Sequence, residues 1–233
     1  MSKQNTEVEN IDEDSKVIKI VPSKLEHVLY KILYKYVGEH IPDHITPNQI
    51  TLVGALGGLF GILCALLSKI SILFLIGTII GIICHFICDD LDGYVARKRN
   101  MTSQAGGYFD LLTDILHITY LIIALAFASI VSFQVGIFLV PVYALIIFTS
   151  MNSILYLKEF PFPRLGPVET HIFFIVICIG AMVFGRGFIL YIKGFGLKLA
   201  DIIFIIGGLL MYYEMIRLQI QLFRKLRVKD NER

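Results

Sequence analysis

The chain has 233 residues, of which 56% are hydrophobic and only 17% are charged. Ordinary soluble domains carry about 25% charged residues. This deficit, together with a mean hydropathy of +0.72, indicates a membrane protein and excludes disordered, collagen-like and disulfide-framework chains. The 21 basic and 19 acidic residues leave a net charge of +2, which is too balanced to predict nucleic acid as a partner.

The N-terminal region divides into two segments. Residues 1–22 are polar and lack the apolar stretch of a secretory signal peptide, so we expect a short tail exposed to water. Within residues 23–42, apolar side chains recur at helical spacing from Leu25 to Val37. This pattern predicts an amphipathic juxtamembrane helix that lies at the membrane interface, with packing against a soluble face of the domain as the alternative.

Six apolar stretches follow, each near the roughly 20 residues that cross about 30 Å of hydrocarbon. They comprise residues 48–68, 70–92, 108–132, 135–157, 168–188 and 199–220. Because a backbone in lipid has to satisfy its hydrogen bonds internally, each stretch is predicted to be a helix. The sequence therefore predicts an all-α integral membrane protein with six transmembrane helices in one domain, residues 43–224, and a basic tail, residues 225–233.

The basic residues predict the orientation of the chain. With both termini in the cytoplasm, 17 of the 21 Lys and Arg residues fall on the cytoplasmic side. The opposite side then holds only Lys69, Arg186, Lys193 and Lys198. This bias favours a multi-pass protein with both termini inside.

Acidic residues are rare in the apolar region and gather where the second stretch ends and the third begins. Asp89 and Asp92 are three residues apart, and Asp110 and Asp114 are four apart, so each pair lies on one helix face. The short connection predicts antiparallel neighbouring helices, on which the four carboxylates converge. Asp90, by contrast, is expected to be a solvated residue at the helix end.

Four like charges in one small volume would repel each other. A divalent cation removes this conflict, and oxygen ligands suit Mg²⁺ or Mn²⁺ better than zinc. The residues between the pairs fit a phosphate ligand, because Arg97 can form a bidentate contact and Gly93 and Gly106 permit close approach. Together with Ala96 and Ser103, they predict a metal-dependent pyrophosphate site.

The pattern Asp89-x2-Asp92-Gly93-x2-Ala96-Arg97-x8-Gly106-x3-Asp110-x3-Asp114 resembles the signature of the CDP-alcohol phosphotransferase family, also termed CDP-alcohol phosphatidyltransferase class-I. Enzymes of that family join an alcohol to a phosphoryl group from a CDP-linked donor and release CMP. They are typically six-helix membrane homodimers with two divalent metal ions. The resemblance therefore implies a phospholipid-synthesis transferase whose active site faces the cytoplasm, with one lipid substrate.

The resemblance also implies roles for individual residues. The two metal ions, Mg²⁺ or Mn²⁺, would be held by Asp89, Asp92, Asp110 and Asp114. Asp114 would in addition act as the general base for the acceptor hydroxyl. The CDP site would be lined by Gly93, Ala96, Arg97, Ser103 and Gly106. Residues 46–51 resemble the stretch that opens the first span in this family, which adds Asn48 to the CDP site; a helix start with proline in its first turn is the alternative.

The donor is not settled by these motifs. The length of the chain favours CDP-diacylglycerol, whereas Phe109-Asp110 and Gly166-Pro167-Val168-Glu169 are similar to the choline/ethanolamine phosphotransferase branch. An intramembrane prenyltransferase and a cation transporter are more distant alternatives. His85 and His117 either orient metal ligands or pack in the bundle, and Glu169 is a candidate contact of the acceptor headgroup.

Overall fold

The structure, a computed structural model, describes residues 18–20, 24–161, 166–192 and 195–231. Its α-helices are α1 (Lys24–Tyr36), α2 (Pro47–Leu67), α3 (Phe74–Lys98), α4 (Gln104–Phe127), α5 (Phe133–Leu157), α6 (Pro167–Phe184) and α7 (Leu199–Asn231). Its short strands are β1 (Ile18–Ile20), β2 (Glu159–Pro161), β3 (Phe188–Ile192) and β4 (Phe195–Lys198). Apart from β1, the expected polar tail lies outside the described residues.

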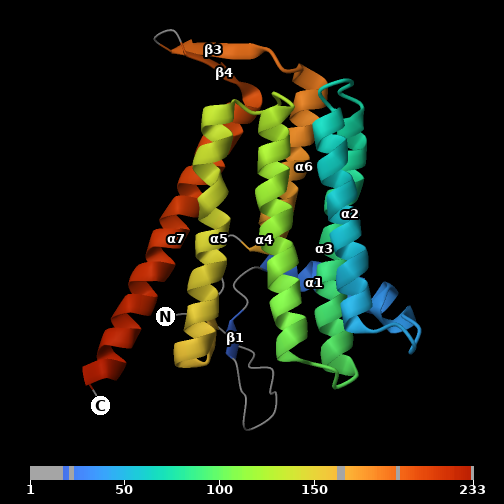
Figure 1. The fold of residues 1–233 in the computed structure, drawn as a ribbon, viewed down its shortest axis with the longest axis vertical. Helices are drawn as coiled ribbons and strands as arrows, with labels where there is room; N and C mark the ends of the chain where they lie inside the picture. Colours follow the sequence, from blue (N-terminus) through green and yellow to red (C-terminus); the bar gives the residue numbers. More distant parts are fainter. Residues whose placement is uncertain (1–17, 21–23, 162–165, 193–194, 232–233) are drawn as a thin grey trace.

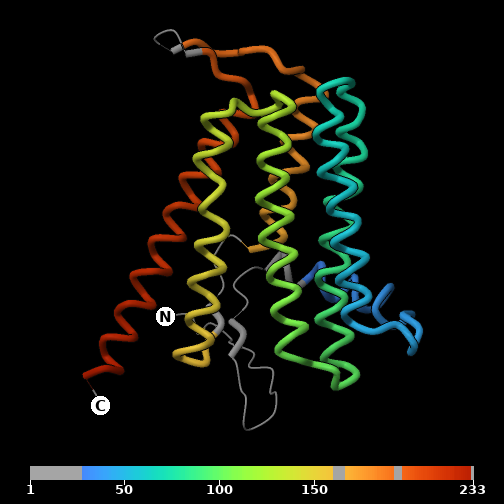
Figure 2. The backbone as a smooth tube through the Cα atoms, in the orientation of Figure 1, coloured from blue at the N-terminus to red at the C-terminus, as the bar shows by residue number. Residues whose placement is uncertain are grey.

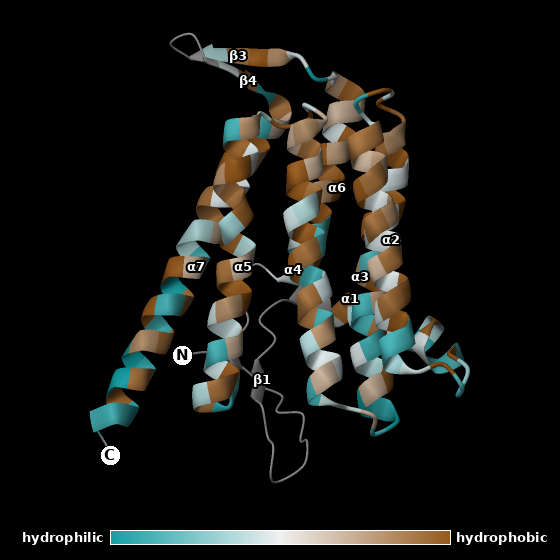
Figure 3. Cartoon of the chain, viewed as in Figure 1, coloured by the Kyte–Doolittle hydropathy of each residue, from teal (hydrophilic) through white to brown (hydrophobic). Residues whose placement is uncertain are grey.

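Helices α2 to α7 are each long and apolar enough to cross a membrane, which confirms the predicted six-span, all-α fold. They form an elongated bundle in which α7 leans away from its neighbours toward its C-terminal end (Figure 1). The connection between α3 and α4 lies at one end of the bundle and the hairpin of β3 and β4 at the other (Figure 2). Hydrophilic residues gather at the α3–α4 end and on the last turns of α7 (Figure 3).

Several boundaries differ from the predicted ones. Helix α3 continues past residue 92 to Lys98, and α4 begins at Gln104, so both aspartate pairs lie within helices. The earlier start of α4 follows from its N-cap, because the Ser103 hydroxyl accepts a hydrogen bond from the Gly106 N–H at 3.0 Å. Helix α7 continues to Asn231, through the segment that was expected to be a tail. Helix α1 ends at Tyr36, and a 3₁₀ turn follows at Gly38–His40.

The first span begins with a capping box. The Thr46 hydroxyl accepts from the Gln49 N–H at 3.4 Å, and the Gln49 side chain accepts from the Thr46 N–H at 2.8 Å. Pro47, in the first turn, has no N–H to satisfy. These residues therefore fix where α2 enters the bundle.

Glycines allow the close packing of α2 against α3. A Cβ atom on Gly61 would lie only 3.1 Å from the Gly81 Cα, and a Cβ atom on Gly81 would overlap the Gly61 backbone. The two helices therefore approach backbone to backbone at this point.

The core and the outer surface of the bundle are both apolar. The largest buried side chains include Leu121, Leu125, Ile177 and Phe204. On the outer face of α2, leucines 52, 56, 59 and 63 are each about half exposed. In water such a surface would be unfavourable, but lipid chains can cover it.

A buried carboxylate joins α5 to α7 at the end of the bundle opposite the aspartate pairs. Asp201 is fully buried, and its oxygens accept hydrogen bonds from the Ser132 N–H and hydroxyl, both at 2.6 Å, and from the Lys198 N–H at 2.9 Å. The Lys198 ammonium group donates to the Ser129 carbonyl oxygen at 2.6 Å. The sequence analysis did not predict this junction or the short strands.

Candidate active site

The site lies where α3 and α4 approach the same end of the bundle. Helix α2 packs against both of them, while α3 also packs on α6 and α4 on α5. Helices α3 and α4 run antiparallel, as predicted, and aspartates from both meet at this end of the bundle.

Three of the predicted aspartates come together. One carboxylate oxygen from each of Asp89, Asp110 and Asp114 lies within 4.8 Å of the others. Asp89 comes from α3 and the other two come from α4, so neither helix could form the group alone. All three side chains are partly buried, and Asp114 is 15% exposed. A group of carboxylates that is partly shielded from water fits a divalent cation with oxygen ligands.

Asp92 lies outside this group of three. Its carboxylate accepts a hydrogen bond from the Thr51 hydroxyl of α2, and both residues are 5% exposed. The sequence analysis assigned Thr51 no role, although it lies in the stretch that resembles the family's first span. The hydrogen bond ties the beginning of α2 to the acidic face of α3.

All five aspartates nevertheless line one cavity of about 170 Å³. Gly93 and Arg97 of the predicted phosphate site line it as well. The expectation that Asp90 is solvated is wrong, because its side chain is buried and borders this cavity. Helix α3 continues past Asp90 for two further turns, which removes the residue from the helix end.

The remaining residues of the predicted CDP site lie beside the cavity and do not line it. Ser103 is the N-cap of α4, and a Cβ atom on Gly106 would lie 2.9 Å from the Ser103 Oγ and 3.2 Å from the Asn48 Oδ1. Asn48, Ser103 and Gly106 thus form a second polar group where α2 and α4 begin. Ala96 is partly buried on α3.

Helix α1 covers one side of the site. Tyr34 stacks on Tyr94 of α3 with ring centroids 4.3 Å apart, and Tyr30 and Tyr34 both line the acidic cavity. The opposite face of α1 leaves Val28 and Ile32 about half exposed. One face of this helix therefore packs on the bundle, and the other offers apolar side chains to its surroundings.

The segment between α1 and α2 is tied to the end of α3. The Arg99 guanidinium donates to the carbonyl oxygens of Ile41 and Ile45, each at 2.7 Å. Lys98 forms an ion pair with Glu39 at 2.7 Å, and this contact lowers the pKa of the exposed Glu39 carboxyl below its usual value. These contacts hold the segment that leads into Asn48.

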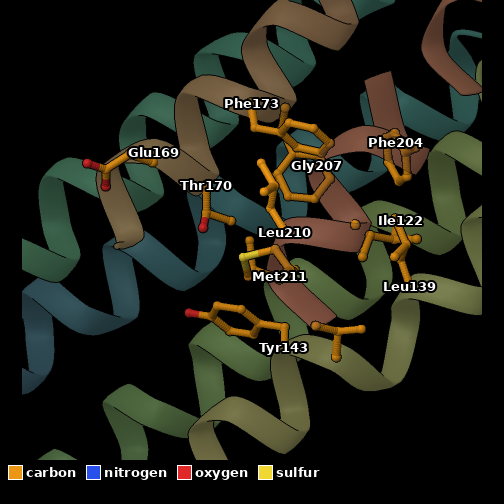
Figure 4. A pocket seen from close by; sticks show the side chains of 14 residues that line it. Ile122, Leu139, Tyr143, Glu169, Thr170, Phe173, Phe204, Gly207, Leu210 and Met211 are labelled. Carbon is orange, nitrogen blue, oxygen red and sulfur yellow. The ribbon is translucent and has the colours of Figure 1, made fainter. Parts of the chain in front are cut away.

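A second cavity, also of about 170 Å³, lies among α4, α5, α6 and α7. Its walls are mostly apolar, and in Figure 4 Phe173 and Tyr143 lie on opposite sides of it, with Met211 between them. Tyr143, Thr170 and Met211 line the acidic cavity too, so the two spaces adjoin. Tyr143 and Ser150, two turns apart on α5, are site residues that the sequence analysis missed; their polar groups in an apolar span were the available signal.

The histidines gather deeper in the bundle. His85 stacks on His117 with ring centroids 4.0 Å apart, and its Nε2 lies 3.8 Å from the Asp114 Oδ1. His171 of α6 lies near both, with ring centroids 6.0 and 6.2 Å away. The sequence analysis left open whether His85 and His117 orient metal ligands or pack in the bundle, and it did not predict that His171 lies beside them. Glu169 accepts from the Gly166 N–H at 3.0 Å and caps α6.

Comparison with protein families gives a match to CDP-alcohol phosphatidyltransferase over residues 44–216. The chain belongs to this family. The match includes every aspartate of the site and all but the last turns of the six-helix bundle. A comparison with curated proteins found no significant match.

Membership makes the chain a transferase that uses a CDP-alcohol donor and an alcohol acceptor. It favours phosphotransfer over the prenyltransferase and transporter alternatives. CDP-alcohol phosphatidyltransferases depend on divalent metal ions in general, and the group of Asp89, Asp110 and Asp114 supplies the oxygen donors that such an ion requires. The residues of this transferase therefore fit the metal requirement of its family.

Proposed function

We propose that this transferase moves a phosphatidyl group from CDP-diacylglycerol to the hydroxyl of a polar alcohol and releases CMP. The observation that carries the proposal is the single cavity in which the aspartates of α3 and α4 meet Gly93 and Arg97. Carboxylates for cations, a guanidinium for phosphate and a glycine for close approach are the groups that a pyrophosphate donor needs.

The proposed metal ligands are Asp89, Asp92, Asp110 and Asp114, with Mg²⁺ or Mn²⁺ as the two ions. When bound, these ions would supply positive charge to the phosphate oxygens of the donor. Asp92 is held by Thr51 and falls outside the group of the other three carboxylates, which supports a division of the ligands between two positions. Thr51 keeps Asp92 oriented toward the cavity.

The chain's own residues would carry the remaining steps. Asp114 would receive the proton of the acceptor hydroxyl on a carboxylate oxygen, as the acceptor oxygen forms its bond to phosphorus. The bond from phosphorus to the CMP oxygen breaks, and CMP leaves with the electron pair. Arg97 would balance the charge of the leaving phosphate. Because a carboxylate is a weak base, the fixed positions of donor and acceptor have to supply much of the rate.

The adjoining apolar cavity supports a lipid substrate. It begins at Tyr143 and Thr170, which also border the acidic cavity, and continues between the aromatic side chains of α6 and α7. A hydrocarbon chain attached to a phosphate could occupy both spaces at once. The distribution of basic residues supports a cytoplasmic opening for the site, and the family resemblance supports a homodimer. The amphipathic pattern of α1 supports a position at the membrane interface.

The second candidate is transfer from CDP-choline or CDP-ethanolamine to diacylglycerol. Its support is the stretch from Gly166 to Glu169, which resembles that branch of the family. In the structure this stretch starts α6 and borders both cavities: Gly166 and Pro167 line the acidic one, and Glu169 lines the apolar one. The two candidates share the same phosphotransfer chemistry. They differ in whether the lipid is part of the CDP-linked donor or is the acceptor.

The proposal is tested by incubating the purified protein with Mg²⁺ or Mn²⁺ and a matrix of CDP-linked donors and alcohol acceptors. We expect CMP release with CDP-diacylglycerol and a polar alcohol, with the lipid product identified by mass. Asp114→Asn should abolish turnover, and Asp230→Asn at the exposed end of α7 is the matched control. CMP release only with CDP-choline or CDP-ethanolamine would support the second candidate. Full activity of Asp114→Asn would show that Asp114 is not the general base.

A further inference from the structure

Three buried histidines from three different helices form a compact group. His85, His117 and His171 are 3%, 3% and 6% exposed, and they come from α3, α4 and α6. One ring nitrogen of each lies within 4.8 Å of the others. His85 lies four residues before Asp89, about 6 Å along the helix axis, so the group lies about one turn deeper in the bundle than the carboxylates.

The hydrogen bonds of these rings are incomplete. His171 has its Nδ1 2.7 Å from the Pro167 carbonyl oxygen, and the Nε2 of His85 faces Asp114. Within the described part of the chain, the opposite nitrogens of these two rings and both nitrogens of His117 are buried without a hydrogen-bond partner. A buried nitrogen that has lost its contact with water and gained no hydrogen-bond partner is energetically costly. These nitrogens are therefore candidates for binding a ligand.

At His171 the pattern of one bonded and one unpartnered nitrogen matches that of a metal-binding histidine, and at His85 the nitrogen opposite the unpartnered one is turned toward a carboxylate. Such a histidine donates its outer N–H to a backbone carbonyl or a carboxylate and binds the ion through its other nitrogen. Pro167 provides the carbonyl for His171, and Asp114 is the carboxylate toward which His85 is turned. The unpartnered Nδ1 of His85 and Nε2 of His171 are then the nitrogens left for an ion.

We propose that His85, His117 and His171 bind one Zn²⁺ ion, at a position separate from the carboxylate site. Imidazole nitrogens select zinc over Mg²⁺, and three histidines with one open position form a known type of zinc coordination. The nearby aspartates favour a cation electrostatically. The proposal does not depend on which donor the transferase uses.

Binding requires a modest rearrangement. The planes of His85 and His117 are 13° apart in a stack, whereas an ion lies in the plane of each ring that binds it. One ring therefore has to turn about χ2, a torsion with a broad energy profile in histidine. In a tetrahedral zinc site with bonds of about 2.0 Å, ligand atoms lie about 3.3 Å apart, so the three nitrogens also have to draw together.

Gly58 of α2 makes space for this group. A Cβ atom there would lie 2.6 Å from the His117 Nδ1 and 2.8 Å from the His85 Cδ2. The glycine therefore allows the first span to close over the ring pair without displacing it. A larger side chain would push against both rings at once, which makes Gly58 the position where α2 meets the proposed zinc site.

The experiment is to incubate the purified full chain with Zn²⁺ in excess Mg²⁺, remove free metal by gel filtration and count the zinc retained. We expect one zinc per wild-type chain. His117→Gln and His171→Gln should bind zinc at least about ten-fold more weakly, since even the loss of an outer-shell partner costs that much. His44→Gln, at an exposed histidine, should bind like wild type, and Asp89→Asn should retain zinc because it alters only the carboxylate site.

X-ray absorption at the zinc edge of the wild-type protein gives a readout that needs no variant to fold. We expect scattering from three imidazole rings bound through nitrogen. The proposal is overturned if the wild type retains no zinc, if zinc binds without imidazole scattering, or if folded His117→Gln retains zinc as tightly as wild type. These outcomes do not bear on CMP release, so the zinc site can fail while the transferase proposal stands.

Discussion

The Thr51 hydroxyl of α2 donates a hydrogen bond to the Asp92 carboxylate of α3. The donor and acceptor are 41 residues apart in the chain, and both are nearly excluded from water. The contact joins the two most closely packed spans at the edge of the acidic cavity. It also explains why Asp92 faces the cavity without joining the other three carboxylates.

Replacing Thr51 by valine tests this contact with almost no change in volume. Hydrogen bonds to charged groups contribute about 1.5–3 kcal/mol, so misorientation of Asp92 should lower kcat/KM by about ten-fold or more. Thr51→Ser retains a hydroxyl and should keep most of the activity. Steady-state CMP release measures the effect, and a valine variant as active as wild type would show that Asp92 needs no orientation by α2.

Arg97 is expected to act on the donor phosphates. It borders the acidic cavity, and Arg97→Gln should raise KM for the CDP-linked donor by about 10–100-fold, the equivalent of one charge-assisted contact. Arg97→Lys should recover only part of this loss, because an ammonium group cannot form the bidentate contact. The matched control is Arg224→Gln on the exposed end of α7. An unchanged donor KM in Arg97→Gln would place the phosphates elsewhere.

The glycine contact between α2 and α3 makes a prediction about stability. Gly81→Ala would place a methyl group against the Gly61 backbone and should destabilise the fold by about 1–3 kcal/mol, the usual cost of overpacking. The loss should appear as a lower free energy of unfolding in a denaturant titration in detergent. Gly107→Ala is the control, because a Cβ atom there meets nothing within 4 Å. Equal stability of both variants would mean that the helices can separate slightly at no cost.

Asp201 makes a second prediction about stability, at the opposite end of the bundle. Asp201→Ala leaves the Ser132 N–H, the Ser132 hydroxyl and the Lys198 N–H without their acceptor, and should cost about 3 kcal/mol. Donor KM should stay unchanged in the folded fraction, since the site is remote. Thermal unfolding in detergent measures the loss against Asp230→Ala. A melting temperature equal to that of the control would show that water replaces the carboxylate.

The aspartate pairs illustrate what periodicity could predict and where it stopped. Spacings of three and four residues placed each pair on one helix face, and the group of Asp89, Asp110 and Asp114 agrees with that geometry. The same reasoning left Asp90 solvated, because the apolar run appeared to end there. Apolar runs mark where side chains favour lipid, whereas helices end where backbone groups find caps. Helix α3 accordingly runs past the end of its apolar run to Lys98, and the cap at Ser103 sets where α4 begins.

By itself the sequence determined the number of spans, because the lipid environment admits few backbone structures, and helical periodicity placed the residues proposed for the phosphate chemistry on their helix faces. Only the tertiary structure decided which groups meet across helices: Thr51 with Asp92, the rings of His85, His117 and His171, and the apolar cavity beside the acidic one. These contacts depend on how helices rotate and pack against one another. Side chains far apart in the chain determine that packing jointly, and no local pattern records it.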